Sequence, residues 1–318
     1  MPHQPLLTRR QMLACSGLSL SCAVAGAATP APSAAPRAPR TEFGYCLNFG
    51  TISGQKLTLA ERVQIAAQAG YRAIEPWIRE LEDYRQRGGV LADLKKRIAD
   101  LGLRVANTIG FPDWLNDDEA KRTAGLERFQ RDMELSVQIG AEHIAAPPIG
   151  ATQAPVELAR VVERYRTVLD LGRKQGIVAA LELWGGSKTI CRLGEAAYVL
   201  AEAGRPDARA ILDVFHIYRG GSDFAGLRFF HGPALPVFHV NDYPADPPRE
   251  KINDSARVYP GDGVAPLGDV FRALQHIGFR GLLSLEVFNR DYWKQDALAV
   301  ARTGLEKMRA AVAKALAE

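Results

Sequence analysis

The feature that most constrains the fold of this chain is a unit that repeats from residue 41 onward. In each copy, an amphipathic helix pattern ends in glycine and an apolar strand pattern follows within a few residues. Glycine suits this place because it readily takes the positive φ that ends a helix and turns the chain back toward a sheet. The helix-ending glycines are Gly70, Gly102, Gly140, Gly176, Gly204 and Gly278. Strands that alternate with helices pair in parallel, so the repeat predicts a parallel sheet covered by helices.

The number of strands predicts a closed barrel. Six strands follow the helix-ending glycines, and two more are expected at 43–48 and 236–240. The length of residues 41–318 is near the ~250 residues typical of an eight-stranded (β/α)₈ barrel. The alternative, a doubly wound open sheet, usually has a glycine-rich phosphate loop after its first strand, and the glycines in 48–54 lack that spacing. We therefore expect a single-domain TIM barrel of the α/β class over residues 41–318.

The first forty residues have the pattern of an export signal and a leader. Residues 8–13 form a twin-arginine start, and residues 12–27 are weakly apolar without acids or bases. This predicts a twin-arginine signal peptide over residues 1–27, followed by a disordered Pro- and Ala-rich leader over residues 28–40. The apolar stretch is shorter than the roughly 20 residues that span a bilayer, so we expect no stable membrane anchor. We expect a periplasmic protein with the twin-arginine (Tat) export machinery as a partner.

Charge and cysteine content narrow the possible partners and cross-links. The net charge is only +4, several arginines lie in the first forty residues, and no Lys/Arg stripe is present, so we expect no nucleic-acid partner. Cys46 and Cys191 are the two cysteines that remain after removal of the signal. One disulfide is possible in an oxidising compartment, but we expect two separate thiols.

Four successive apolar runs end in a carboxylate or an imidazole. The residues are Glu182, Asp213, His239 and Glu286, at the expected ends of the fifth to eighth strands. The carboxyl ends of all barrel strands open on one face, so these four side chains should meet in one pocket. Three carboxylates would repel one another unless a cation neutralises them. Oxygen-rich ligands with one nitrogen and no thiolate favour Mn²⁺, Mg²⁺ or Co²⁺ over Zn²⁺.

The order of these residues resembles the pattern of the xylose isomerase-like TIM barrel superfamily of sugar isomerases and epimerases. The resemblance covers essentially the whole chain after the leader, and its pattern here reads Glu182, Asp213-x-x-His216, His239 and Glu286. Segments 257–263 and 281–289 look most like the branch that contains inosose isomerases and 3-dehydroshikimate dehydratases. The resemblance implies that Glu182, Asp213, His239 and Glu286 bind the metal. It also implies that His216 reaches a substrate oxygen and that the two glutamates move the proton.

The resemblance implies a metal-dependent isomerase or epimerase of a small sugar or polyol ketone, acting through an enediolate. One alternative is a dehydratase or lyase of the 3-dehydroshikimate dehydratase kind, or one acting on oxidised glycosides. An alternative of another class is a non-catalytic carbohydrate-binding barrel, which does not need three clustered carboxylates. A nuclease of this superfamily would need further histidines at the second and third strand ends, where Glu75 and Asn107 stand. Ala245 replaces an arginine typical of ketose 3-epimerases, and a possible homo-oligomer follows from resemblance alone.

Four further residues are candidates for contact with the substrate. Glu75 would contact a substrate hydroxyl or form a salt bridge with a neighbouring arginine, and Trp184 would provide an aromatic floor for a sugar. Lys188 would pair with a substrate carboxylate or stay exposed, and Arg257 would hold an acidic or hydroxylated substrate or form an ion pair within its loop.

Overall fold

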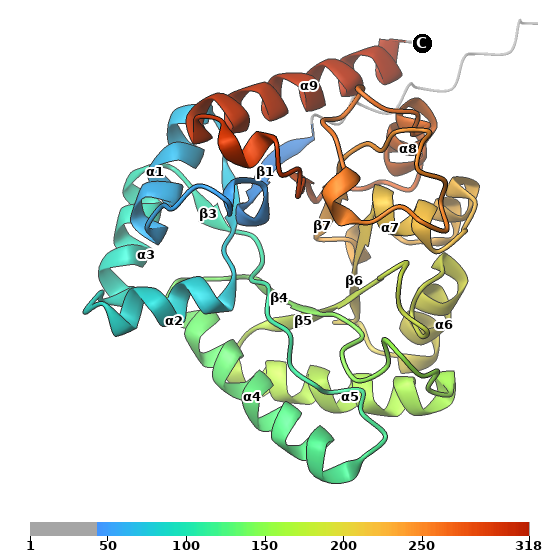
Figure 1. Ribbon diagram of the computed structural model, residues 1–318. Coiled ribbons are helices and arrows are strands. Elements are labelled where there is room, and N and C mark those ends of the chain that lie inside the picture. Colours follow the sequence, from blue (N-terminus) through green and yellow to red (C-terminus); the bar gives the residue numbers. More distant parts are fainter. Residues whose placement is uncertain (1–42, 318) are drawn as a thin grey trace, which may run out of the picture. The chain divides into compact units, whose positions relative to one another are not determined.

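The computed structural model describes residues 43–317 (Figure 1). The predicted signal peptide (1–27) and leader (28–40) lie outside these residues. Eight parallel strands form one sheet in the order β3-β2-β1-β8-β7-β6-β5-β4. The strands are β1 (Gly44–Asn48), β2 (Ala73–Glu75), β3 (Arg104–Val105), β4 (His143–Ala146), β5 (Val178–Glu182), β6 (Arg209–Asp213), β7 (Val237–Val240) and β8 (Leu282–Leu285).

Backbone contacts just after β3 close the sheet into a barrel. The Thr108 N–H donates to the His143 carbonyl at 3.0 Å, and the Ala145 N–H donates to the Thr108 carbonyl at 2.9 Å. Thr108 and Ile144 form a parallel bridge, so the two strands at the ends of the sheet order are joined. The prediction of a (β/α)₈ barrel is confirmed.

Helices surround the strands, and the predicted glycines end several of them. Gly70, Gly176 and Gly204 are left-handed C-caps, and the other three predicted glycines also have positive φ. The α-helices are α1 (Leu59–Ala69), α2 (Ile78–Gln86), α3 (Leu91–Asp100), α4 (Glu119–Gln138), α5 (Leu158–Gln175), α6 (Leu193–Ala203), α7 (Val214–Arg219), α8 (Leu267–His276) and α9 (Ala297–Ala317). Within residues 43–317, none of them is long and apolar enough to cross a membrane.

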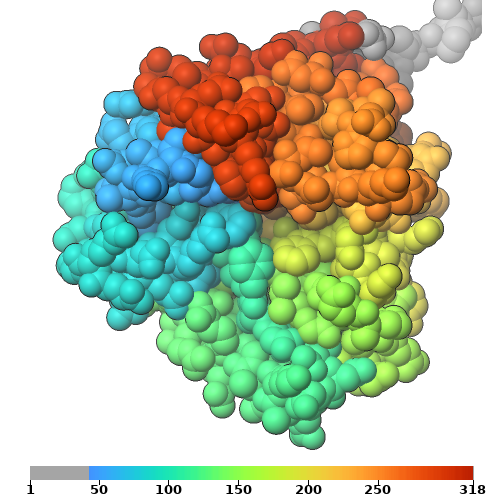
Figure 2. All heavy atoms as spheres, in the orientation of Figure 1, coloured from blue at the N-terminus to red at the C-terminus, as the bar shows by residue number. Residues whose placement is uncertain are grey.

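Short 3₁₀ helices occupy several of the connections. They are η1 (Phe49–Ile52), η2 (Phe224–Phe229), η3 (Gly232–Ala234), η4 (Asp254–Ala256) and η5 (Tyr292–Lys294). The two ends of the described chain lie side by side, because β1 pairs with β8, and α9 contacts both η1 and α1. Figure 2 shows the C-terminal residues (red) packed against the first described residues (blue).

The barrel interior begins with a layer of mostly small apolar side chains. Each strand or the residue after it contributes one buried member: Cys46, Ala73, Ala106, Ala145, Ala180, Ile211, Val237 and Leu282. A larger cluster fills the space between the strands and the helices.

Cys46 and Cys191 are free thiols, as expected.

Candidate active site and metal centre

Strand alternation places a polar layer next to the small apolar layer of the barrel. Alternate residues of a strand point to the same face, so a residue two positions after an interior residue also points inward. Counting two positions on from the apolar layer in the same strand gives Asn48, Glu75, Glu182, Asp213 and His239. In and after β8, the same count gives Ser284 and then Glu286. The predicted strand-end residues therefore gather inside the barrel.

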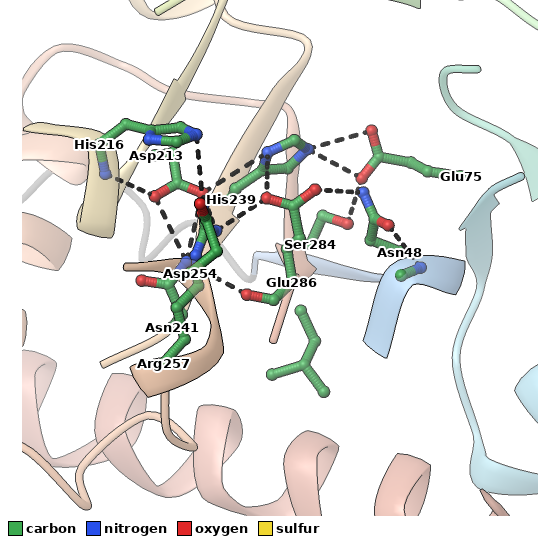
Figure 3. Close-up of polar contacts among 12 residues, drawn as sticks. Asn48, Glu75, Asp213, His216, His239, Asn241, Asp254, Arg257, Ser284 and Glu286 are labelled. Atoms are coloured by element: carbon green, nitrogen blue, oxygen red, sulfur yellow. Dashed lines mark hydrogen bonds and ion pairs between the residues drawn. The ribbon is translucent and has the colours of Figure 1, made fainter. Parts of the chain in front are cut away.

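Three of the four predicted metal ligands lie close together. Asp213, His239 and Glu286 are buried, and each offers a donor atom within 4.8 Å of the other two. His239 Nδ1 lies 3.2 Å from Glu286 Oε2 and 3.7 Å from Asp213 Oδ2 (Figure 3). This nitrogen makes no hydrogen bond to any described residue. An unpaired imidazole nitrogen that faces two carboxylate oxygens fits a divalent cation with ligand bonds of about 2 Å.

Glu182 is not a member of this group of three, but it lines a cavity together with Glu286. Its Oε2 is buried and has no hydrogen-bond partner within residues 43–317. Burial is the main cause that raises the pKa of Glu182 to about 8, and the charges of Glu286 and Glu75 raise it further while His239 opposes them. Without a metal, this carboxyl is therefore mostly protonated at neutral pH. A carboxyl with a pKa near the working pH is suited to general acid–base chemistry.

Glu75 holds the other nitrogen of His239. Its carboxylate lies 3.1 and 3.3 Å from His239 Nε2, accepts a hydrogen bond from Asn107 Nδ2 at 2.8 Å and accepts another from the Ser284 hydroxyl. Burial alone would raise the pKa of Glu75, but His239 and these hydrogen bonds lower it. Burial opposes the charge on His239, yet Glu286 and Glu75 raise the pKa of its imidazole well above the usual value. The pairing keeps a proton on Nε2 and leaves Nδ1 as the atom that faces the other ligands.

This position does not fit the predicted contact of Glu75 with a substrate hydroxyl. Glu75 is fully buried and does not line the cavity. Its ion-pair partner is His239, whereas the alternative prediction was a salt bridge with an arginine. Trp77, two residues further along the chain, is the residue from this strand end that reaches the cavity.

Uncharged donors hold the carboxylates of Asp213 and Glu286 in place. Asp213 Oδ1 accepts the His216 N–H at 2.9 Å, so Asp213 also caps the N-terminus of α7. Glu286 Oε1 accepts from Asn48 Nδ2 at 2.8 Å. Asn241 Nδ2 lies within hydrogen-bond distance of both Asp213 oxygens, at 3.2 and 3.3 Å. Burial would raise the pKa of Asp213, but Arg257 and the two histidines hold it below the usual range.

A cavity of about 280 Å³ opens beside these residues. Its polar lining is Glu182, His216, Asp254, Arg257 and Glu286, and its apolar lining is Trp77, Ile109, Phe111, Trp184 and Phe288. The aromatic rings follow one another around the wall. Their centroids are 6.0 Å apart between Phe288 and Trp77, 5.4 Å between Trp77 and Phe111, and 5.9 Å between Phe111 and Trp184. Pockets for drug-sized ligands are typically roughly 300–1,000 Å³, so this smaller aromatic cavity fits a ligand of about one sugar ring.

The structure places the remaining predicted site residues as follows. Trp184, His216 and Arg257 line the cavity. Lys188 is exposed in the loop between β5 and α6 and does not line it, which agrees with the alternative for this residue. Arg257 is fully buried and forms ion pairs with Asp213, Glu286 and Asp254.

Several residues of the site were not recognised from the sequence. Asn48 ends the first strand and has the two-residue spacing of the other inward side chains, so that spacing could have identified it. Phe111 lies in an irregular segment after β3, and Asp254 begins the short helix η4 in the connection after β7; neither segment has a periodic pattern that indicates the direction of a side chain.

Comparison with known proteins identifies the family of this chain. A family model described as "Xylose isomerase-like TIM barrel" matches residues 63–311. The chain belongs to this family. It is 26% identical over 276 residues to the inosose isomerase of Bacillus velezensis, which covers 85% of this chain and 97% of that protein. It is 25% identical over 253 residues to the 3-dehydroshikimate dehydratase of Pseudomonas aeruginosa, covering 79% of this chain and 39% of that protein.

A solved structure has the same fold. The crystal structure of the IOLI protein with a binding zinc atom superposes with a TM-score of 0.78 at 24% identity, covering 85% of this chain and 98% of that one.

Proposed function

We propose that this protein is a divalent-metal-dependent isomerase or epimerase of a small sugar or polyol ketone, acting through an enediolate. The observation that carries the proposal is that two glutamates, Glu182 and Glu286, line one small cavity, and Glu286 is also a member of the metal donor set. The similarity to an inosose isomerase supports the same class of reaction.

Asp213, His239 and Glu286 would hold the cation, with Glu182 in reach of the same cavity. The cation would supply Lewis acidity toward a ketone oxygen and its neighbouring hydroxyl, which acidifies the C–H bond next to the ketone. One glutamate then removes that proton and the other returns a proton to the second face or to the neighbouring carbon. The unpaired Oε2 and the raised pKa of Glu182 suit it to hold the transferred proton. His216 and Arg257 lie where they can bind substrate oxygens.

The charges in the cavity wall favour an uncharged substrate. Among the described residues that line the cavity, Arg257 is the one permanent cation, and its two Nη atoms already serve three carboxylates. Lys188, predicted to pair with a substrate carboxylate, is exposed outside the cavity. A neutral polyol ketone has no carboxylate and therefore needs no further cation in this cavity.

A dehydratase or lyase is the second candidate, supported by the similarity to a 3-dehydroshikimate dehydratase. It would remove the same proton and then expel a hydroxyl from the next carbon, or the leaving group of an oxidised glycoside. A non-catalytic carbohydrate-binding barrel is a weaker explanation, because binding alone does not require two glutamates beside a metal donor set.

The test is hydrogen exchange in D₂O. The protein is loaded in turn with Mn²⁺, Mg²⁺, Co²⁺ and, because the IOLI structure holds zinc, Zn²⁺. It is then incubated with inososes, ketohexoses or 3-dehydroshikimate. Deuterium at the carbon next to the ketone without loss of water indicates isomerisation, and loss of water indicates dehydration. We expect Glu286→Gln to abolish exchange and Glu142→Gln, an exposed change paired with Arg104, to leave it intact. If the folded protein binds none of these metals and exchanges hydrogen in no substrate, both enzyme proposals are refuted.

We also propose export to the periplasm by the twin-arginine pathway, on the basis of Arg9 and Arg10. Changing both arginines to lysine should keep the protein in the cytoplasmic fraction of a host with an intact Tat system. Normal export of that variant would contradict the proposal.

A further inference from the structure

Arg257 is a fully buried cation in the wall of the cavity, just after η4. Its guanidinium carbon lies 4.6 Å from the ring centroid of Phe215 and 5.0 Å from that of Phe288. A guanidinium is planar and donates in fixed directions, so packing against two rings limits where its hydrogen bonds can point. The direction of Arg257 is therefore set by its aromatic neighbours as well as by its carboxylate partners.

Arg257 Nη1 bonds to the two oxygens that a metal would need. It donates to Asp213 Oδ2 at 2.8 Å and to Glu286 Oε2 at 2.9 Å (Figure 3). These are the oxygens that face His239 Nδ1. The second oxygen of each carboxylate is already engaged, since Asp213 Oδ1 accepts the His216 N–H and Glu286 Oε1 accepts from Asn48. A cation bound by this donor set would compete with Nη1 for the same two oxygens.

We propose that Arg257 is an internal competitor of the divalent cation. Its Nη1 holds the Asp213 and Glu286 carboxylates together before the cation binds, and it releases them when the cation takes its place. Two facing carboxylates repel each other without a positive charge, so the guanidinium preserves the geometry of the ligands. It also weakens cation binding, because the bonds of Nη1 are lost and the two positive charges repel each other. This inference rests on the metal site of the proposed function.

The other end of the guanidinium gives this competition a consequence for substrate binding. Nη2 donates to Asp254 and lies 3.2 Å from His216 Nε2, and both of these residues line the cavity. These contacts keep the guanidinium in the cavity wall after Nη1 has left the carboxylates. Nη1 is then free to donate to a substrate oxygen. Binding is therefore ordered, with the cation first and the substrate second.

The test is calorimetric titration of metal-stripped protein with MnCl₂, which needs no substrate. Wild type is compared with Arg257→Met and with Arg79→Met as a matched control. Arg79 is an exposed cation 4.4 Å from the ring centroid of Trp77, so its removal changes the charge near the cavity without touching the ligands. We expect Arg257→Met to bind Mn²⁺ at least about tenfold more tightly, which corresponds to one charge-assisted hydrogen bond. In chelator, the same variant should melt at a lower temperature than wild type.

The outcomes separate this inference from the proposed function. Equal or weaker binding by folded Arg257→Met, while wild type binds Mn²⁺, overturns the competition and leaves the metal site in place. Absence of binding by both folded proteins overturns the metal site and the competition together. Arg257→Lys serves if the methionine variant does not fold, because a lysine keeps the charge but lacks the planar fork. Tighter Mn²⁺ binding by the lysine variant supports competition, and affinity equal to wild type refutes it.

Discussion

Changing Glu75 to glutamine should weaken metal binding although Glu75 is not a predicted ligand. In the structure, the negative carboxylate keeps a proton on His239 Nε2, so that Nδ1 faces Asp213 and Glu286. A glutamine with its NH₂ group toward His239 would force the imidazole to accept at Nε2. The proton would then move to Nδ1, which could no longer bind a cation.

The size of the effect follows from the partners of Glu75. Asn107 has a buried Oδ1 without a partner, so its amide can turn and accept from the NH₂ of the new glutamine. That rearrangement keeps an oxygen toward His239 and loses only the negative charge. Replacing the outer partner of a metal-binding histidine typically costs 10- to 100-fold in affinity, which is about 1.4–2.8 kcal/mol. We expect Glu75→Gln to lose about tenfold in metal affinity if the Asn107 amide turns, and about 100-fold if it does not.

Calorimetric titration with Mn²⁺ measures this change directly. The control is Glu142→Gln, which removes an exposed carboxylate paired with Arg104 and should leave the affinity unchanged. Circular dichroism must show that both variants are folded. Wild-type affinity in folded Glu75→Gln would refute the argument that Glu75 sets the direction of His239.

Three further predictions concern other parts of the barrel. Burial raises the pKa of Glu182 to about 8, so this carboxyl destabilises the fold increasingly as pH rises from 4.5 toward 8. In chelator, Glu182→Gln should therefore leave the free energy of unfolding unchanged near pH 4 and raise it by up to about 3 kcal/mol at pH 7. Denaturant titrations measure this gain, and a gain that does not grow with pH would contradict the prediction. Trp184→Ala should raise KM about tenfold or more by removing an aromatic wall, and an unchanged KM would place the substrate elsewhere. A β-carbon at Gly125 would lie 2.2 Å from the Asp113 carbonyl oxygen, so Gly125→Ala should cost about 1–3 kcal/mol. Gly194→Ala is the control, because Gly194 has open space around it, and its stability should stay within about 1 kcal/mol of wild type. Thermal melts of both variants measure these changes.

The sequence was sufficient to predict the fold and the residues at strand ends. The glycine that ends each helix and the apolar run that follows it are local signals, and they locate the end of each strand to within a few residues. The inward direction of Asp213 and His239 then follows from alternation along the strand. These features depend on short-range geometry, so local sequence patterns are enough to predict them.

The roles of Glu75 and Lys188 depend on features that the sequence does not record. A strand-end residue can reach the cavity or pair with the neighbouring strand ends beneath it, and Glu75 pairs with His239 because Asn107 and Ser284 complete its hydrogen bonds. Lys188 follows Trp184 in one loop, but the path of that loop leaves the tryptophan in the cavity and the lysine outside it. Loop paths arise from packing between distant segments and have no periodic pattern.

The small apolar layer and the polar layer above it are two consequences of the same alternation. In β5, Ala180 and Glu182 point to the same face, as do Ile211 and Asp213 in β6. A larger side chain at Ala180 would push against buried neighbours from the other strands, and densely packed interiors relax little. The displacement would pass to Glu182 and its neighbours, whose donor atoms must meet within a few tenths of an ångström to bind a cation. Apolar residues of the barrel interior therefore contribute to the geometry of the metal site although they touch neither metal nor substrate.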